Sequence, residues 1–322
     1  MNAEEVKSIL AVDVGATNLR VALFHGRLLK NKVKSRTPRS GGSDAVALEI
    51  IRLARDALKV GEVDAIGVAS IGPLDLKRGW VVNTPNNPLR NFELKRPLKE
   101  EFQAPVYIAN DCVAAVWGEK TLGRGSPYSD LAYITISTGI GGGFIVDGEL
   151  LVGWRGNAHE IGHIVVDYNS NIRCGCGGLG HWEGIAGGNS IPKTARIYAL
   201  KWEGDRTNAY EMALEGKLSS EVLYRLARLG DKFAESLVDY LNRVHAAGIA
   251  SIIASYDPQV IYLGGSVFLE NKDIMLDNIN RYLSRFSIFK SPPLVPATFG
   301  HDEVLYGAAA IALKPPRSLI RV

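Results

Sequence analysis

Short runs of apolar residues, each ended by a polar or glycine-rich turn, alternate along the chain with longer segments of helical periodicity. The run SILAVDV at 8–14 is typical of a buried strand, because it is almost entirely apolar and too short for a helix. Between residues 44 and 59 the apolar residues instead recur every three or four positions, which indicates a helix. By these criteria the sequence predicts strands at 8–14, 19–24, 28–33, 64–70, 106–109, 131–137, 260–265 and 294–299, and helices at 44–59, 94–102, 113–122, 219–228, 231–255, 273–286 and 303–313.

The predicted order of elements occurs twice. Near the N-terminus two strands flank a turn at Gly15, and near the middle the strand 131–137 and the segment FIVDGEL flank a second glycine turn. Alternating helices and strands follow each pair, so we expect two similar α/β domains that face each other across a cleft. We assign a small α/β domain to residues 1–115 with the C-terminal helix 303–322, and a large one to residues 116–302.

Composition and charge exclude several classes of protein. The 322-residue chain has a net charge of +3 and dispersed basic residues, which does not indicate binding to nucleic acid or to a membrane surface. No apolar run approaches ~18 residues, so no membrane span is expected, and the acidic start MNAEEVKSILAVDVG does not resemble a signal peptide. Three cysteines are too few for a disulfide framework, so we expect a cytoplasmic protein.

The segment DVGATN, from Asp13 to Asn18, joins two strands, whereas Walker and dinucleotide-binding loops lead into a helix. Gly15 would let backbone amides approach phosphate oxygens closely, and Thr17 can add a hydroxyl donor. A carboxylate beside phosphates requires a cation between them, and Mg²⁺ held through water is the candidate at Asp13. The same residues also fit a plain hairpin turn, so this motif alone leaves both interpretations open.

Two further glycine segments, TGIGGG at 138–143 and LGGS at 263–266, lie at strand ends. Two glycine turns, each beside a repeated strand pair, can hold a triphosphate from both sides. The LGGS segment can admit a nucleoside against bare backbone, or it can be a tight turn into a helix. The nucleotide-binding residues predicted in these turns are Asp13, Gly15, Ala16, Thr17, Asn18, Thr138, Gly139, Gly141, Gly142, Gly264 and Gly265.

The segment that follows combines HEIGH at 159–163 with CGCGGLGHWEG at 174–184, and residues 137–188 contain 15 of the chain's 34 glycines. Two thiolates and two imidazoles are a suitable ligand set for a closed structural Zn²⁺ site, and the glycines allow the chain to curl around the metal. We therefore predict a zinc site formed by His163, Cys174, Cys176 and His181. A glycine-rich loop without metal is the alternative.

HEIGH also matches the HExxH motif of zinc proteases. That motif needs a helix that places both histidines on one face. Here it follows the loop GWRGNA, contains Gly162 and runs into the β-rich sequence IVVD. A zinc protease is therefore the weaker enzyme interpretation.

The chain resembles the ROK family (repressors, open reading frames and kinases) of the actin-like ATPase superfamily, and most closely its glucokinase and broad-specificity hexokinase members. The resemblance extends from the Asp13 turn to the helix GAAAIAL at 307–313, and HEIGH with the CGCG segment is its most specific part. It implies two actin-like (ribonuclease H-like) domains, ATP, Mg²⁺, structural Zn²⁺ and a homodimer or homotetramer. The positions that depart from the family pattern are Ala16 and His159 in place of glycine, His181 in place of cysteine and Gly187 in place of serine.

Asp111 follows a predicted strand and opens a helix. A carboxylate there can accept the proton of a primary hydroxyl while a γ-phosphate is held in line. The resemblance implies this role of general base for Asp111, although an aspartate at this position can also be a helix N-cap. The sugar-binding residues that the resemblance implies are Gly72, Asn83, Asn110, Asp111, Glu160, His163 and Glu183, and it places Gly188 beside the nucleotide.

These assignments predict an ATP-dependent hexokinase or glucokinase that phosphorylates the 6-hydroxyl of an aldohexose. Glucose is the first candidate; mannose, amino sugars, N-acetyl sugars and fructose stay open because they differ from it by a single group. The alternative from another class is a sugar-sensing ROK-type regulator without kinase activity. Such regulators carry a helix-turn-helix ahead of the kinase-like part, whereas the first strand here begins near Ser8, so we expect an enzyme.

Overall fold

The computed structural model describes residues 7–84, 87–154 and 156–320, and the chain divides into two compact units. The C-terminal helix belongs to the same unit as the N-terminal strands. Unit 1 comprises Met1–Leu131, Gly143–His159 and Asp302–Val322, and unit 2 comprises Ala132–Gly142 and Glu160–His301. This division differs from the boundary at 115/116 that we predict between the domains, and that boundary stays a prediction.

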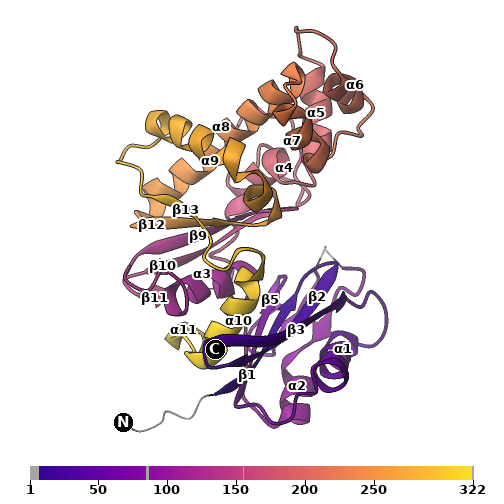
Figure 1. The fold of residues 1–322 in the computed structure, drawn as a ribbon, viewed down its shortest axis with the longest axis vertical. Helices are drawn as coiled ribbons and strands as arrows, with labels where there is room; N and C mark the ends of the chain where they lie inside the picture. The colour runs from indigo at the N-terminus through magenta and orange to yellow at the C-terminus, as the bar shows by residue number, and fades with distance from the viewer. Residues whose placement is uncertain (1–6, 85–86, 155, 321–322) are drawn as a thin grey trace. The chain divides into compact units, whose positions relative to one another are not determined.

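A five-stranded sheet with the order β3-β2-β1-β4-β8 forms the centre of unit 1 (Figure 1). β1 pairs antiparallel with β2 and parallel with β4, and β4 runs parallel to β8. The last residues of the three parallel strands, Val14, Ser70 and Asn110, therefore lie side by side at one edge of the sheet. The strands are β1 (Ser8–Val14), β2 (Asn18–His25), β3 (Leu28–Arg36), β4 (Ala65–Ser70) and β8 (Val106–Asn110).

Both faces of this sheet are covered, which explains why β1 and β4 are apolar at almost every position. On one face Leu10, Val12 and Val14 join a core cluster with Ile50 of α1 and Leu98 of α2. The other face is covered by α10, which also packs against α3. The helices of unit 1 are α1 (Ala45–Arg52) with the π turn η1 (Leu53–Ala57), α2 (Lys95–Phe102), α3 (Asp111–Thr121), α10 (Glu303–Leu313) and α11 (Arg317–Ile320).

Glycine allows α10 to approach its neighbours at backbone distance. A Cβ atom on Gly67 of β4 would overlap the carbonyl oxygen of Ala308 in α10. A Cβ atom on Gly118 of α3 would lie 2.9 Å from the Cα atom of Gly307. Since real Cβ atoms do not pack this closely, these contacts require glycine.

A second five-stranded sheet has the order β11-β10-β9-β12-β13, and the division between the units passes through β10. Asp147 and Gly148, with φ values of 52° and 78°, form an Asp-Gly hairpin turn between β10 and β11. The strands are β9 (Leu131–Ile136), β10 (Ile140–Val146), β11 (Glu149–Leu150), β12 (Val260–Gly264) and β13 (Leu294–Pro296).

Six helices of the described chain belong to unit 2. The helices α7 and α8, which precede β12 in the chain, each begin with a side-chain cap. The Ser219 hydroxyl accepts a hydrogen bond from Val222 N at 3.3 Å, and the Asp231 carboxylate accepts one from Ala234 N at 3.0 Å. The helices are α4 (Trp182–Ala186), α5 (Ile191–Ala199), α6 (Asn208–Leu214), α7 (Ser220–Arg228), α8 (Lys232–Tyr256) and α9 (Ser266–Phe286).

The structure adds elements that the apolar pattern does not predict. Helices α4, α5 and α6 were not expected, and α9 begins at Ser266, seven residues before the predicted start. A three-stranded sheet of β5 (Leu74–Asp75), β6 (Trp80–Val81) and β7 (Phe92–Glu93) is also new, because strands of two residues have no measurable period. Within the ranges that the structure describes, no helix is long and apolar enough to cross a membrane.

We predict that Gly67→Ala destabilises the protein by about 1–3 kcal/mol, the usual cost of overpacking a core, because the new methyl group must displace α10. Thermal or urea unfolding would measure this loss. Gly61→Ala is the matched control, since a Cβ atom there meets nothing within 4 Å. Equal stability of the two variants would contradict the tight contact between β4 and α10.

Candidate active site and metal-binding cluster

Two aspartates of unit 1 lie at the sheet edge where β1, β4 and β8 end. Asp13 is the penultimate residue of β1 and is buried, and Asp111 directly follows β8 and is half-buried. Burial raises the pKa of Asp111 above the ordinary value of an aspartate, and the negative charge of Asp13 raises it further. The two carboxylates therefore lie close enough to oppose each other's ionisation.

Asn110, and not Asp111, is the N-cap of α3. Its Oδ1 atom accepts hydrogen bonds from the backbone N–H groups of Cys112, at 2.9 Å, and Val113, at 3.4 Å. Asp111 is the first helical residue, and its Oδ1 atom accepts from Cys112 N at 2.8 Å. The interpretation of Asp111 as an N-cap is therefore wrong, and the start of the helix engages one of its two carboxylate oxygens.

Arg20 is the partner of Asp13 and was not predicted. Its Nε and Nη2 atoms donate to Oδ2 of Asp13 at 2.7 and 2.6 Å, and its Nη1 atom lies 3.5 Å from Asp302. Burial raises the pKa of Asp13, and the positive charge of Arg20 offsets part of that effect. The antiparallel register of β1 and β2 places Arg20 directly opposite Asp13, so a hairpin alignment of the sequence would have revealed the pair.

The first glycine turn is closed by the backbone between β1 and β2. Gly15 N donates to the carbonyl oxygen of Asn18 at 2.9 Å, and a Cβ atom on Gly15 would lie 2.9 Å from that same oxygen. The hydroxyl of Thr37 donates to the carbonyl oxygen of Gly15 at 2.7 Å, and Thr37 N donates to that of Thr17 at 3.0 Å. Thr17 and Asn18 are exposed, so the turn formed with Ala16 presents their side chains to solvent.

His159 is a second residue near Asp111 that was not assigned a role. Burial is the largest cause of the raised pKa of Asp111, and the charge that His159 can carry acts in the opposite direction. His159 is itself only 6% exposed. This position departs from the family pattern, and the structure shows that it lies within electrostatic reach of the predicted base.

The two remaining predicted sugar-binding residues of unit 1 lie after β4. Gly72 precedes Pro73 through a cis peptide bond, at the turn that leads from β4 to β5. Asn83 is exposed, has a φ of 50° and donates its backbone N–H to Oδ1 of Asn91 at 2.8 Å. Pro85 and Asn86, which follow Asn83 in the chain, lie outside the described residues.

In unit 2 a tight turn at 137–139 joins β9 to β10. Ser137 N donates to the carbonyl oxygen of Gly139 at 2.9 Å. Gly188 N donates to that of Ser137 at 2.8 Å, and Asn189 N donates to that of Thr138 at 2.9 Å. The structure thus brings three predicted nucleotide-binding residues together: Thr138, Gly139 and Gly188.

The Gly264-Gly265 turn packs directly against the same end of β9. A Cβ atom on Gly265 would overlap the carbonyl oxygen of Ile136. The hydroxyl oxygens of Ser137 and Ser266 lie 3.0 Å apart. The second and third glycine segments are therefore neighbours, as one nucleotide site requires.

The second half of the predicted TGIGGG turn is wrong. Gly141 and Gly142 lie inside β10, which begins at Ile140. Gly142 is buried, and a Cβ atom there would lie 2.6 Å from Cδ1 of Ile161. Glycine is therefore required at 142 for packing. The turn prediction failed because a run of apolar and glycine residues can continue a strand as easily as it can form a loop.

Glu183, in α4, contacts the backbone of the second glycine turn. Its Oε2 atom accepts a hydrogen bond from Ile140 N at 2.8 Å. A Cβ atom on Gly139 would overlap that same oxygen. The predicted sugar-binding carboxylate is thus adjacent to the predicted phosphate-binding turn.

Four metal-binding side chains of unit 2 converge within residues 163–181. One ligand atom each from His163, Cys174, Cys176 and His181 lies within 4.8 Å of all the others. Cys174 Sγ is 3.8 Å from Nδ1 of His163, and Cys176 Sγ is 3.2 Å from Nδ1 of His181. The structure therefore brings all four predicted ligands together, and two sulfur and two imidazole donors fit a tetrahedral zinc ion.

Backbone pairing closes the loop that carries these ligands. Isolated bridges join Val165 to His181 and Arg173 to Leu179, and Cys174 N donates to the carbonyl oxygen of Gly178 at 2.8 Å. A Cβ atom on Gly178 would overlap the ring of His181. Glycine at 178 thus leaves room for this imidazole.

His163 has different neighbours at its two ring nitrogens. Its Nδ1 atom faces Cys174, and its Nε2 atom lies 3.4 Å from Oε2 of Glu160. It ends a three-residue 3₁₀ helix, Ile161–His163. The HExxH sequence therefore does not lie on an α-helix, and the structure does not support the zinc protease interpretation.

The chain is similar to known proteins over nearly its full length. The model of the ROK family matches residues 9–315. A glucokinase from Aeropyrum pernix is 45% identical, over 97% of this chain and 98% of its own length, and one from Pyrobaculum calidifontis is 43% identical over 96% of each. A crystal structure of a ROK family glucokinase from Streptomyces griseus, in complex with glucose and AMPPNP, is 29% identical with a TM-score of 0.78 and covers 95% of this chain and 99% of its own.

We predict that Asp111→Asn raises the melting temperature at about pH 7.5, because the amide avoids the cost of burying a charge and keeps the acceptor for Cys112 N. Since the pKa of Asp111 is raised in the folded state, its ionisation destabilises the fold above that pKa. The stability gain should therefore shrink as the pH falls toward the ordinary pKa of aspartate.

Asp277→Asn, at an exposed position of α9, is the control and should shift the melting temperature little. A gain for Asp111→Asn that does not depend on pH, or no gain, would contradict this account.

Proposed function

The chain belongs to the ROK family, and we infer from this premise that it is an ATP-dependent hexokinase with glucose as its substrate. The glucokinases to which it is similar match it over almost their whole length, and one relative binds glucose and the ATP analogue AMPPNP. The reaction transfers the γ-phosphoryl group of ATP to the 6-hydroxyl of the sugar and releases ADP.

The observation that carries the mechanism is the environment of Asp111. We propose that its carboxylate accepts the proton of the 6-hydroxyl while the sugar oxygen attacks the γ-phosphorus in line with the leaving ADP. A raised pKa makes Asp111 a stronger base than an exposed aspartate. The start of α3 fixes the carboxyl group through one oxygen, which supports an orientation that does not depend on the substrate.

We propose that the glycine turns bind the nucleotide and that Mg²⁺ neutralises its phosphates. Because Arg20 already occupies Oδ2 of Asp13, contact of Asp13 with Mg²⁺ through water is favoured over direct ligation. Gly141 and Gly142 stay among the proposed residues, although they lie within β10 and not in a turn. The proposed nucleotide-binding residues are Asp13, Gly15, Ala16, Thr17, Asn18, Thr138, Gly139, Gly141, Gly142, Gly188, Gly264 and Gly265.

We propose that the sugar hydroxyls are bound by the residues that the family resemblance implies. The cap of α3 uses Oδ1 of Asn110, so its amide NH₂ is the group proposed for the sugar. Glu160 and His163 form one contact pair, and Glu183 lies beside Gly139. The proposed sugar-binding residues are Gly72, Asn83, Asn110, Asp111, Glu160, His163 and Glu183.

We propose that His163, Cys174, Cys176 and His181 bind a structural Zn²⁺ ion. Bound zinc would stabilise the glycine-rich loop and fix the ring of His163, with Nδ1 on the metal and Nε2 toward Glu160. His181 supplies a competent ligand in place of the cysteine of the family pattern. We also propose, from cysteine usage and the family resemblance, a cytoplasmic homodimer or homotetramer.

Asp111→Asn should lower kcat for glucose by ~10²–10⁴, the usual contribution of a positioned base, and should change the KM values for glucose and ATP much less. A coupled assay of ADP release measures this effect. Turnover near that of the wild type would exclude Asp111 as the base.

The purified protein should contain one zinc ion per chain by elemental analysis, and a chelator should lower its melting temperature because the metal binds the folded loop. Cys174→Ser should lose the metal. Cys112→Ala is the control and should keep it, since Cys112 lies in α3 of unit 1. A zinc-free protein whose melting curve does not respond to chelation would rule out the site.

A further inference from the structure

Helix α9 is interrupted one turn after it begins. Asn271, with φ −127° and ψ 17°, lies outside the helical region, and the helix resumes after it. A helix break needs a local cause, and no proline or glycine occurs between residues 266 and 286. Asn271 is 7% exposed, and its Nδ2 atom donates to the carbonyl oxygen of Val267 at 2.8 Å.

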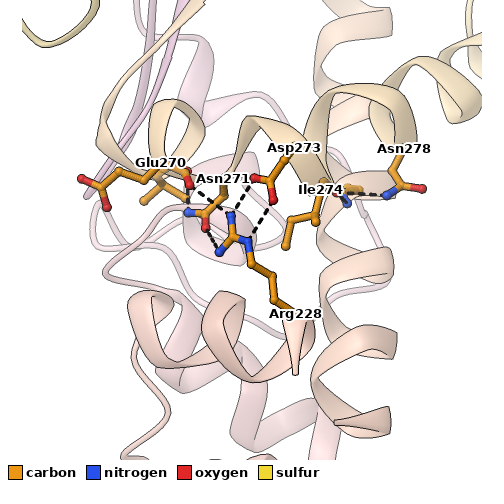
Figure 2. Close-up of polar contacts among 8 residues, drawn as sticks. Arg228, Glu270, Asn271, Asp273, Ile274 and Asn278 are labelled. Carbon is orange, nitrogen blue, oxygen red and sulfur yellow. Dashed lines mark hydrogen bonds and ion pairs between the residues drawn. The ribbon is translucent and has the colours of Figure 1, made fainter. Parts of the chain in front are cut away.

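The guanidinium group of Arg228, the last residue of α7, forms hydrogen bonds to the residues at this break (Figure 2). Its Nη1 atom donates to Oδ1 of Asn271 at 2.9 Å, and Nη2 donates to the carbonyl oxygen of Glu270 at 3.0 Å. Its Nε and Nη2 atoms form a bidentate pair with Asp273 at 2.9 and 2.7 Å. Arg228 thus uses four of its five N–H groups on residues 270–273, a geometry that lysine cannot reproduce.

The helical turn before the break contacts the proposed nucleotide site. The hydroxyls of Ser266 and Ser137 lie 3.0 Å apart. A Cβ atom on Gly188 would lie 3.1 Å from Cγ2 of Val267, so Val267 packs against Gly188. Two hydrogen bonds therefore connect Arg228 to Val267 through Asn271, and one packing contact connects Val267 to the glycine turns.

We propose that Arg228 is a positioning residue for ATP, an inference that rests on the proposed function. By holding α9 broken at Asn271, it keeps Ser266 against the hydroxyl of Ser137 and Val267 against Gly188. Without the guanidinium group, Oδ1 of Asn271 loses its partner and the break loses its cause. The first turn of α9 is then free to realign with the rest of the helix and to withdraw from the glycine turns.

An ion pair on the surface is the competing explanation, because the side chains of Arg228 and Asp273 are 35% and 55% exposed. Such a pair would contribute a little stability and nothing to nucleotide binding. The chain offers a matched control, an exposed arginine on α9 itself that pairs with an aspartate. Arg281, further along α9, pairs with Asp239 of α8 at 2.6 Å and lies beyond the break.

Arg228→Met should raise KM for ATP by ~10-fold, the usual order for losing hydrogen bonds to a charged group, and leave KM for glucose within ~2-fold. Arg281→Met should change neither value by more than ~2-fold. Arg228→Lys, which keeps the charge but not the fork, should fall between wild type and Arg228→Met and serves if Arg228→Met does not fold. Calorimetry with Mg-ATP and no sugar should show the same order of dissociation constants.

The KM values and dissociation constants decide between the two explanations. An effect on KM for ATP that is confined to the Arg228 variants supports the positioning role. Equal effects of Arg228→Met and Arg281→Met, or a normal affinity for ATP in the Arg228 variants, would overturn it. If the wild type shows no turnover with any sugar, the proposed function fails, while Mg-ATP calorimetry on the same variants still decides the role of Arg228.

Discussion

The position of Asp111 depends on contacts that place the backbone of α3 directly against its neighbours. Gly118 of α3 meets Gly307 of α10, and a Cβ atom on Gly143 of β10 would overlap the carbonyl oxygen of Cys112. Contacts between backbones have no rotamers through which to relax, so a change at any of them must move a whole helix or strand. The proposed base thereby lies at the start of a rigid element, which is the arrangement that precise proton transfer requires.

Placing two carboxylates at this sheet edge opposes folding. Burial raises the pKa of both Asp13 and Asp111, and each ionised group is unfavourable for the other, while Arg20 offsets part of the cost at Asp13. Sequences that minimise local conflict avoid such pairs, and proteins retain them mainly where charge is used. We interpret the unfavourable electrostatics as the source of the basicity of Asp111.

The sequence predicts best those features that depend on neighbours in the chain. The run 8–14 forms β1 as predicted. Cys174, Cys176 and His181 converge with His163 because they are close in sequence and the glycines between them let the chain curl tightly. Features that depend on the alignment of distant segments were missed. Arg20 becomes the partner of Asp13 only through strand register, and the break at Asn271 follows from a residue 43 positions away. The binding roles of the predicted residues stay proposals.

Phosphoryl transfer to a hexose is the central claim, and the most direct test is ADP release by the wild-type protein with Mg-ATP and a panel of sugars. The panel contains glucose, mannose, fructose, glucosamine, N-acetylglucosamine and N-acetylmannosamine, and phosphorus NMR identifies the product. The account predicts ADP release that depends on glucose, with the phosphate on the 6-oxygen. No ADP release with any sugar, together with sugar binding detected by calorimetry, would contradict it and would indicate a sugar-sensing regulator.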